Sequence, residues 1–320
     1  MILTLIIGYL STLLWTSSEE QQPHPLREVL LIGFIQFSFL VFLSTEVLSY
    51  TRWLNSTGVF IFWLSITAMS LIFRYKKLPH IGQLFQNSLQ RTSTVLSAAS
   101  RTQQILLGLT VALLAGVFLQ AILYPPNNWD SLTYHMGRIS HWIQNASVEH
   151  YSTYIYRQLY QPPFAEFVIT HSLLLTDSDL WANGVQFIYL LFSLLTISLI
   201  LKTLNYGWAV QCTAIVLAVM TPEILLQGSS TQNDVVGSFF LLSAIYWMLK
   251  SWQSGKTYAS ITFFALSVGL GLITKGTGYV FAGPVALFLA GSYLQDIFQK
   301  KAFHLLLHGV LTVVIIFSIL

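Results

Sequence analysis

Charged residues are scarce in this sequence. Of its 320 residues only 8% are Asp, Glu, Lys or Arg, whereas 54% are hydrophobic. A soluble domain carries about 25% charged residues, because its surface must be hydrated. A chain with so little charge cannot cover itself against water, so we expect most of its surface to face lipid.

Cysteine and basic runs are scarce as well. The single cysteine, Cys212, excludes an intrachain disulfide and a thiol-based metal or redox site. The net charge is only +3, and no basic run is interleaved with aromatic residues. Both features argue against nucleic acid as a partner.

Long apolar stretches are the main feature of the sequence. A membrane-spanning helix needs roughly 20 mostly apolar residues. Ten stretches qualify, near residues 1–15, 29–49, 58–73, 104–123, 183–201, 207–226, 234–250, 258–274, 277–295 and 303–320. The predicted fold class is all-α: a polytopic transmembrane helical bundle with a long extracytoplasmic loop that contains interfacial helices. Because the sequence ends at Leu320 inside an apolar run, we expect a fragment or a truncated gene product.

The distribution of Lys and Arg predicts the orientation, since these residues stay on the cytoplasmic side. Residues 74–101 carry five basic side chains and no acid, so this segment is predicted to lie inside. The next span leads outward and places the loop from Tyr124 to Asn183 outside. Counting on along the chain, the basic residues predicted to lie inside are Lys202, Lys250, Lys256, Lys300 and Lys301. We expect a bacterial plasma (inner) membrane protein with its active site facing outward.

The chain divides into three predicted regions. Residues 1–123 hold transmembrane helices and a cytoplasmic polar segment near 74–103, which is expected to lie along the inner membrane surface. Residues 124–183 form the extracytoplasmic loop with the active-site motif. Residues 184–320 return to transmembrane helices, and the carboxy-terminal part of such a protein is expected to be missing.

The outer loop has the composition expected of a functional site. It holds four of the eight histidines and five of the twelve acids, whereas a connector needs only a handful of residues. The pattern over 130–145 is helical, and a spacing of four, four and three places Asp130, Tyr134, Arg138 and His141 on one face. The structural alternative is that Asp130 caps this helix and pairs with Arg138. After Pro162 and Pro163, residues 164–175 are predicted to form a second interfacial helix.

Two further span ends carry ionisable groups. Asp234 begins one predicted span, and Lys275 follows another. The predicted topology places both at the same membrane face as Asp130. Ionisable groups at span ends are costly unless they are paired or hydrated, so they are functional candidates. The structural alternatives are a helix cap for Asp234 and snorkelling to the interface for Lys275.

Four short motifs, in order, carry a family resemblance. They are Trp129-Asp130 with Tyr134, Gln161-Pro162-Pro163-Phe164, Thr231 to Asp234, and Ile273-Thr274-Lys275-Gly276. Together they resemble the GT-C class of glycosyltransferases, and within it the protein O-mannosyltransferase and aminoarabinose-transferase superfamily. The sequence departs from the family pattern in two places. Ser131 stands where a second acid often follows Asp130, and Gln161 stands where Lys often precedes the Pro pair, with Arg157 one turn earlier.

This resemblance implies a membrane enzyme that transfers a sugar, with inversion, from a polyprenyl-phosphate donor to a lipid, glycan or protein acceptor at the extracytoplasmic face. It gives Asp130 the role of catalytic base. The substrate-binding candidates are Tyr134, His135, Arg138, Arg157, Gln161, Asp234 and Lys275. Among them, Lys275 and Arg138, with Arg157 behind them, would meet the phosphate charge. Asp234, with His135 or Gln161, would orient the acceptor or hold a divalent ion.

Two other classes of function stay open from the sequence. A transporter or flippase for lipid-linked sugars usually places its charges near the bilayer midplane on broken helices. A non-catalytic membrane scaffold would use the loop to bind a partner. Consumption of the donor by the purified protein separates the enzyme from both.

Overall fold

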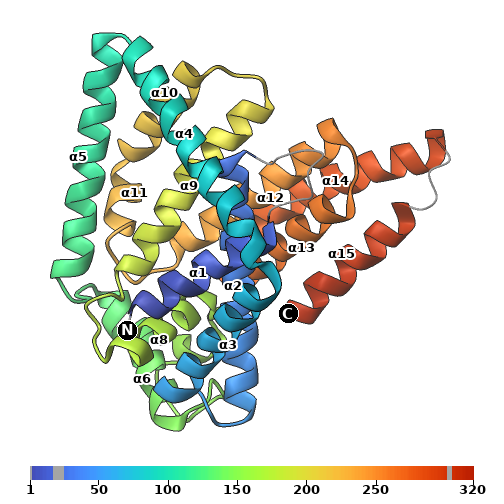
Figure 1. Ribbon diagram of the computed structural model, residues 1–320. Coiled ribbons are helices and arrows are strands. Elements are labelled where there is room, and N and C mark those ends of the chain that lie inside the picture. The colour runs from blue at the N-terminus through green and yellow to red at the C-terminus, as the bar shows by residue number, and fades with distance from the viewer. Residues whose placement is uncertain (1, 17–24, 301–304) are drawn as a thin grey trace.

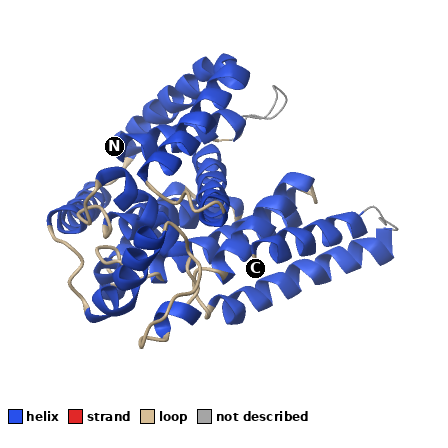
Figure 2. Cartoon of the chain, turned by 90° about the horizontal axis from the view of Figure 1, so that it is seen from below, coloured by secondary structure: helices blue, strands red, loops and turns tan. Residues whose placement is uncertain are grey.

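The computed structural model describes residues 2–16, 25–300 and 305–320, and every regular element in these ranges is a helix (Figures 1 and 2). This confirms the predicted all-α class. The helices are α1 (Ile2–Thr16), α2 (Leu26–Tyr50), α3 (Ser56–Arg74), α4 (Leu78–Ala98), α5 (Arg101–Leu123), α6 (Met136–Asn145), α7 (Arg157–Tyr160), α8 (Phe164–Thr176), α9 (Gly184–Thr203), α10 (Trp208–Val219), α11 (Pro222–Gln227), α12 (Asp234–Ser254), α13 (Tyr258–Leu272), α14 (Gly278–Lys300) and α15 (Leu305–Ile319).

Nine of the ten predicted spans each coincide with one helix, although the outermost residues of the first and last spans and Lys301 lie outside the described ranges. Among the described residues, six helices are long and apolar enough to cross a membrane: α2, α3 running on into α4, α5, α9, α12 and α14. The helices α1, α10, α13 and α15 are shorter. The predicted span 207–226 is wrong as one helix. It is divided into α10 and α11 before Pro222, because proline has no N–H to continue a helix and is best placed in a first turn.

The centre of the bundle is an aromatic cluster where α2, α9 and α12 cross. Phe34 of α2 stacks on Phe192 of α9 with ring centroids 3.7 Å apart. Phe239 of α12 meets Phe34 edge-on at 5.2 Å. Such aromatic pairs add about 0.5–1.5 kcal/mol each beyond the area that they bury. Helix α12 also packs against α13 and α14, so the cluster ties the second half of the chain to α2.

Polar groups gather at two opposite ends of the bundle. The loop end carries residues 124–183, with α6 and α8 lowest in Figure 1 and α10 at the top. At the loop end, Ser49 of α2 contacts Ser147 at 3.1 Å. At the opposite end, Arg27 donates to Ser198 at 2.9 Å, and Lys250 pairs with Glu28. Lys250, which the sequence predicts to lie inside, is thus at the same end as Arg27.

Helix α8 confirms the predicted helix over 164–175, and its side chains lie inside the bundle. Most of its side chains are buried, and it packs against α2, α3 and α6. The ring of His171 accepts from Trp63 Nε1 at 3.1 Å and bonds Thr45 at 3.0 Å. Buried residues occupy every face of α8, which is the pattern of a buried helix rather than a surface one.

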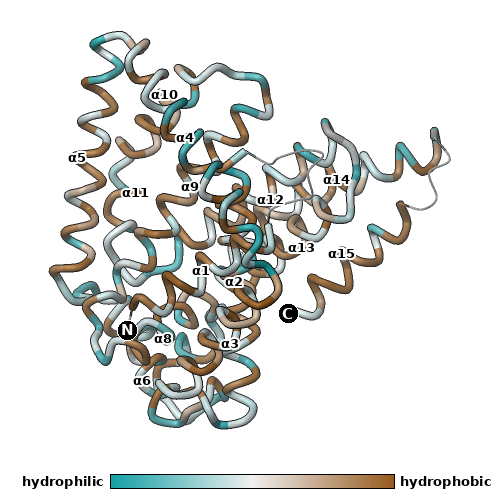
Figure 3. Tube along the Cα trace, viewed as in Figure 1, coloured by the Kyte–Doolittle hydropathy of each residue, from teal (hydrophilic) through white to brown (hydrophobic). Residues whose placement is uncertain are grey.

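Helices α4 and α5 lie at the edge of the bundle. The trace of α5 is hydrophobic along most of its length in Figure 3, and only three of its residues are buried. Helix α4 is polar and largely exposed, and its first turn follows the basic residues Arg74, Lys76 and Lys77. An exposed apolar helix beside an exposed polar one is the arrangement expected when the first faces lipid and the second faces the membrane surface.

Candidate active site

The first motif forms an irregular helix start at the loop end. The Asn128 side chain caps it by accepting from the Ser131 N–H at 2.7 Å, after Pro125 and Pro126 have ended α5. Residues Ser131–His135 then form a π-helical turn that runs into α6. A π-turn contains one extra residue and is frequent at functional sites. It rotates α6 relative to Asp130, which changes which side chains share a face.

The expected single face of Asp130, Tyr134, Arg138 and His141 is therefore wrong. Asp130 and Tyr134 both meet Arg157, whereas His141 stacks on Tyr151 with ring centroids 4.0 Å apart. Arg138 points into the protein and does not pair with Asp130. The spacing rule of a regular α-helix fails here, because it assumes a constant 3.6 residues per turn.

Arg138 is completely buried and holds the loop together. Its guanidinium donates to the backbone carbonyls of Gln158 at 2.7 Å, Arg157 at 3.0 Å and Gln161 at 2.9 Å. It also donates to Glu166 Oε1 at 3.3 Å. These partners occupy Arg138 inside the protein, so the expectation that it meets a donor phosphate has no support in its position.

Glu166 of α8 is the buried acid that Arg138 contacts. His135 Nδ1 lies 2.8 Å from Glu166 Oε1, and both side chains are inaccessible to solvent. Burial by itself raises the pKa of Glu166. The hydrogen bond from His135 and the positive charges of His135 and Arg138 outweigh it and lower that pKa below its ordinary value. His135, expected to bind substrate, is instead part of this buried support.

Arg157 is the exposed cation of the loop. Its guanidinium lies 3.6 Å from Asp130 Oδ1, with 57% and 35% of the two side chains exposed. It also lies 5.9 Å from the ring centroid of Tyr134, at cation–π distance. Arg157 therefore occupies the position beside Asp130 that the sequence assigned to Arg138.

A second carboxylate–cation pair comes from the other half of the chain. Asp234 is the first residue of α12, and Lys275 follows α13; their side chains form a salt bridge. The N-cap of α12 is Asn233, so the expected cap role of Asp234 is wrong by one residue. Asn233 donates to the Thr274 carbonyl at 2.8 Å, which fixes the turn before Lys275 against the start of α12.

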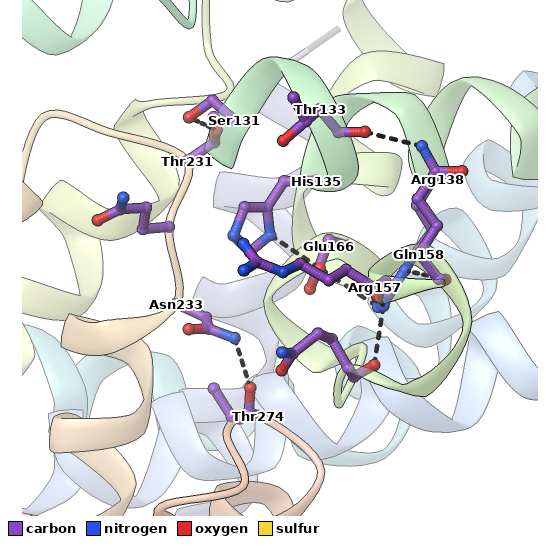
Figure 4. Close-up of polar contacts among 12 residues, drawn as sticks. Ser131, Thr133, His135, Arg138, Arg157, Gln158, Glu166, Thr231, Asn233 and Thr274 are labelled. Carbon is purple, nitrogen blue, oxygen red and sulfur yellow. Dashed lines mark hydrogen bonds and ion pairs between the residues drawn. The ribbon is translucent and has the colours of Figure 1, made fainter. Parts of the chain in front are cut away.

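Short polar contacts join all four motifs, as Figure 4 shows in part. The Thr231 hydroxyl donates to Ser131 at 2.5 Å, linking the first motif to the third. The Phe164 N–H donates to the Ile273 carbonyl at 2.9 Å, linking the second to the fourth. Segments far apart in the sequence are thereby held at one end of the bundle.

Tyr134 lies beside the Asp130–Arg157 pair. Burial raises the pKa of Tyr134 to about 12, and the carboxylates of Asp130, Glu166 and Asp234 add to the rise while Arg157 opposes it. The phenol hydroxyl is therefore a neutral hydrogen-bond donor at physiological pH. Charges from both ion pairs therefore act on the phenol of Tyr134.

A groove runs down from the second pair between α12, α13 and α14. Its volume is about 270 Å³, and Asp234 and Lys275 lie among its lining residues. Small and apolar residues form much of the rest, including Gly237, Gly271 and Phe281. The groove is therefore charged at one end and mostly apolar along the rest of its length.

The fit of a divalent ion to this region can be judged from its donors. Asp130 and Asp234 each already face a cationic side chain. Within the described residues, no group of three or more His, Cys, Asp or Glu side chains is placed to hold a metal. These donor side chains do not fit a divalent ion.

Sequence reasoning missed Glu166 as part of the site. A signal was available, since an acid within the apolar run 164–175 has to be paired if that helix is buried. Gln161, a candidate for acceptor binding, contributes its backbone carbonyl to Arg138 and lies on the wall of a separate cavity.

Comparison with known proteins adds the family. A family model described as dolichyl-phosphate-mannose-protein mannosyltransferase matches residues 160–319, half of the chain. The match includes three of the four motifs and begins after Asp130. No curated protein and no solved structure matches the chain. With its apolar helices and these motifs assembled at one end, the chain is a multi-pass membrane protein that belongs to the dolichyl-phosphate-mannose-protein mannosyltransferase family of glycosyltransferases.

Proposed function

We propose that this protein transfers a sugar from a polyprenyl-phosphate carrier to an acceptor hydroxyl at the extracytoplasmic face of a bacterial plasma membrane. The observation that carries the proposal is the pair of salt bridges, Asp130–Arg157 and Asp234–Lys275, on segments that the Thr231–Ser131 and Asn233–Thr274 hydrogen bonds join at one end of the bundle. This end thus offers both carboxylates and cations, which the reaction requires in different places.

The carboxylate of Asp130 is the proposed base. An acceptor hydroxyl is a poor nucleophile until its proton is taken by a positioned group. Asp130 takes that proton as the acceptor oxygen attacks the anomeric carbon of the donor sugar. The bond from this carbon to the phosphate oxygen breaks, and its electron pair leaves with the phosphate. Attack from the side opposite the leaving group inverts the anomeric centre.

Lys275 and Arg157 are the proposed phosphate-binding cations. The polyprenyl phosphate gains negative charge as it leaves, and cations placed beforehand stabilise that charge more than they stabilise the intact donor. Lys275 offers a point charge, and Arg157 a planar fork. Both are partly exposed, as contact with an entering substrate demands. Asp234 holds Lys275 at the groove until the phosphate arrives.

The groove between α12, α13 and α14 is the proposed path of the prenyl chain. Its charged end carries Lys275, so a phosphate there would leave the chain running along the apolar lining. Hydrophobic contact of this kind contributes about 0.8 kcal/mol for each buried methylene. The proposed orientation rests on the basic residues of segment 74–101, because Lys and Arg favour the cytoplasmic side.

The test measures release of polyprenyl phosphate by the purified chain in lipid nanodiscs. A panel of polyprenyl-phosphate hexoses and pentoses, mannose included, is supplied with an outer-envelope extract as acceptor. The wild type should release the carrier, and Asp130→Asn and Lys275→Met should each do so at least about a hundredfold more slowly. Asp179→Asn, an exposed acid of the same loop, is the matched control.

Several outcomes decide against the proposal. Full release by Asp130→Asn removes this residue from the role of base. Movement of intact donor across the membrane without release supports a flippase instead. Absence of release with every donor contradicts transferase activity.

A further inference from the structure

A second cavity opens at the loop end, on the other side of α7 from Asp130. Its volume is about 500 Å³, within the range of about 300–1,000 Å³ that is usual for small-molecule sites. Gln158 and Gln161 lie on its wall, and the guanidinium of Arg138 behind them reaches the buried Glu166. The backbone that carries Arg157 to Asp130 therefore also forms the wall of this cavity.

Among the lining residues of the cavity two carboxylates, Glu46 and Glu149, stand against one arginine, Arg138, and one histidine, His150. Glu46 at the end of α2 lines it, and forms no hydrogen bond or ion pair with any other residue that the structure describes. Glu149 lines it as well and pairs with Arg52 at 2.5 Å. Arg138 is the lining arginine, and carbonyls and Glu166 already engage it. An anionic ligand would meet an unpaired carboxylate here without a free guanidinium to offset it.

Aromatic rings supply the other half of the lining. Tyr50 and Tyr160 are 89% and 66% exposed, and Trp142 forms part of the buried wall. Tyr151 donates to Gln158 at 2.9 Å, which fixes its ring in place. Rigid aromatic side chains present a large apolar surface beside a polar tip at little entropic cost. The C–H face of a sugar ring matches such a surface, and its hydroxyls are donors for a carboxylate.

We infer that this cavity is a subsite for an oligosaccharide acceptor that is uncharged or carries amino groups. Glu46 accepts hydrogen bonds from its hydroxyl or ammonium groups, and Tyr50 and Tyr160 pack against its rings. This inference rests on the proposed function for the identity of the ligand as acceptor. The distal sugars occupy the cavity, and the terminal sugar passes over α7 to present its hydroxyl to Asp130. The phosphate-bearing donor is kept out of the cavity by charge and approaches from the Lys275 groove.

The test is a binding measurement without donor, on the full chain in nanodiscs by isothermal titration calorimetry. Three trisaccharides of equal length serve as probes: maltotriose, which is neutral; the glucosamine trimer, which carries amines; and trigalacturonic acid, which carries carboxylates. The glucosamine trimer should bind best, maltotriose more weakly, and trigalacturonic acid not at all. Glu46→Gln should weaken the glucosamine trimer about tenfold, and Tyr50→Ala should weaken both binding probes.

Matched controls come from the same end of the bundle. Glu223→Gln removes an exposed carboxylate, and Tyr154→Ala an exposed ring, neither of which lines the cavity. Both should bind like the wild type. Unchanged affinity in Glu46→Gln and Tyr50→Ala, equal binding of trigalacturonic acid, or no binding of any probe at millimolar concentration would each overturn the inference.

Failure of the transferase proposal gives a different result. Lys275→Met should keep wild-type saccharide affinity, because Lys275 is proposed to bind the donor and does not line the cavity. If Lys275→Met and Asp130→Asn also keep full carrier release while Glu46→Gln loses binding, the subsite stands and the assignment of the catalytic groups fails.

Discussion

Two arginines of the loop, Arg138 and Arg157, lie in opposite environments. Arg138 is inaccessible to solvent and bonded to three carbonyls and a carboxylate, whereas Arg157 is more than half exposed and faces Asp130. A buried guanidinium that loses its partners leaves several polar groups unsatisfied, but an exposed one is readily replaced by water. Substitutions at the two positions should therefore affect different properties.

Arg157→Gln should lower the rate of carrier release about a hundredfold and leave the unfolding temperature within about one degree of wild type. Its exposed charge contributes little to the stability of the fold. In the proposed mechanism it stabilises the negative charge that develops on the leaving phosphate. Carrier-release kinetics and thermal unfolding of the purified variant measure both. A fall in unfolding temperature with unchanged release would reverse the roles given to the two arginines.

Glu166→Gln should destabilise the protein by about 3–5 kcal/mol near neutral pH, because it leaves Arg138 buried without its carboxylate. The folded-state pKa of Glu166 is lowered, so its contribution to stability is fully present above the ordinary carboxyl pKa of about 4.3. That contribution is lost as the pH falls through the lower folded-state value.

The unfolding temperatures of wild type and Glu166→Gln should therefore converge below about pH 4.3, and differ most at higher pH. Scanning calorimetry in one detergent across the pH range makes the comparison. A difference that is constant with pH would show that the cost arises from packing rather than from charge.

At the scale of elements, much of the fold is predictable and the site only in part. Runs of apolar residues predict helices α2, α5 and α9 directly, because length and hydropathy are local properties. No periodic pattern in the sequence predicts the π-turn over Ser131–His135, and this turn directs Arg138 away from Asp130. The contact of Thr231 with Ser131 likewise depends on tertiary packing. The sequence therefore named the motifs but could not choose between Arg138 and Arg157.

The groove between α12, α13 and α14 depends on small side chains. A Cβ atom added at Gly237 would meet only Lys275 Cβ at 3.7 Å and Thr274 Cγ2 at 3.9 Å, which are ordinary contacts. Gly237→Ala should thus fold normally, whereas Gly237→Leu should fill the groove. We expect Gly237→Leu to raise the KM for the polyprenyl-phosphate donor about tenfold or more.

Donor titrations of the two variants test this expectation, with the unfolding temperature as a check on folding. A water-soluble donor with a short carrier chain should be affected much less by Gly237→Leu. Equal effects on long and short carriers would place the prenyl chain elsewhere.

At the scale of the whole molecule, the arrangement of charges predicts sidedness. Basic residues of 74–101, Lys202 and Lys250 belong to one set of connections, and residues 124–183 belong to the other. Helix α9 runs from Gly184 to Thr203 and has 20 residues, or about 30 Å, which matches the hydrocarbon thickness of a bilayer.

Cysteine labelling tests this orientation. Cys212 is the only cysteine, so Cys212→Ala gives a background without thiols. In intact cells, a membrane-impermeant maleimide should label Tyr154→Cys in that background and leave Gln90→Cys unlabelled until the cells are opened. Labelling in the reverse order would place the candidate site in the cytoplasm.

The contacts that join Ser131 to Thr231 and Phe164 to Ile273 also have a consequence for biosynthesis. A ribosome delivers Asp130 to the membrane long before it delivers Lys275. In the proposed mechanism the growing chain therefore has a base but no phosphate-binding lysine until the helix before Lys275 has been inserted. On that proposal a nascent chain does not consume lipid-linked sugar before the turn at Thr274 has been translated.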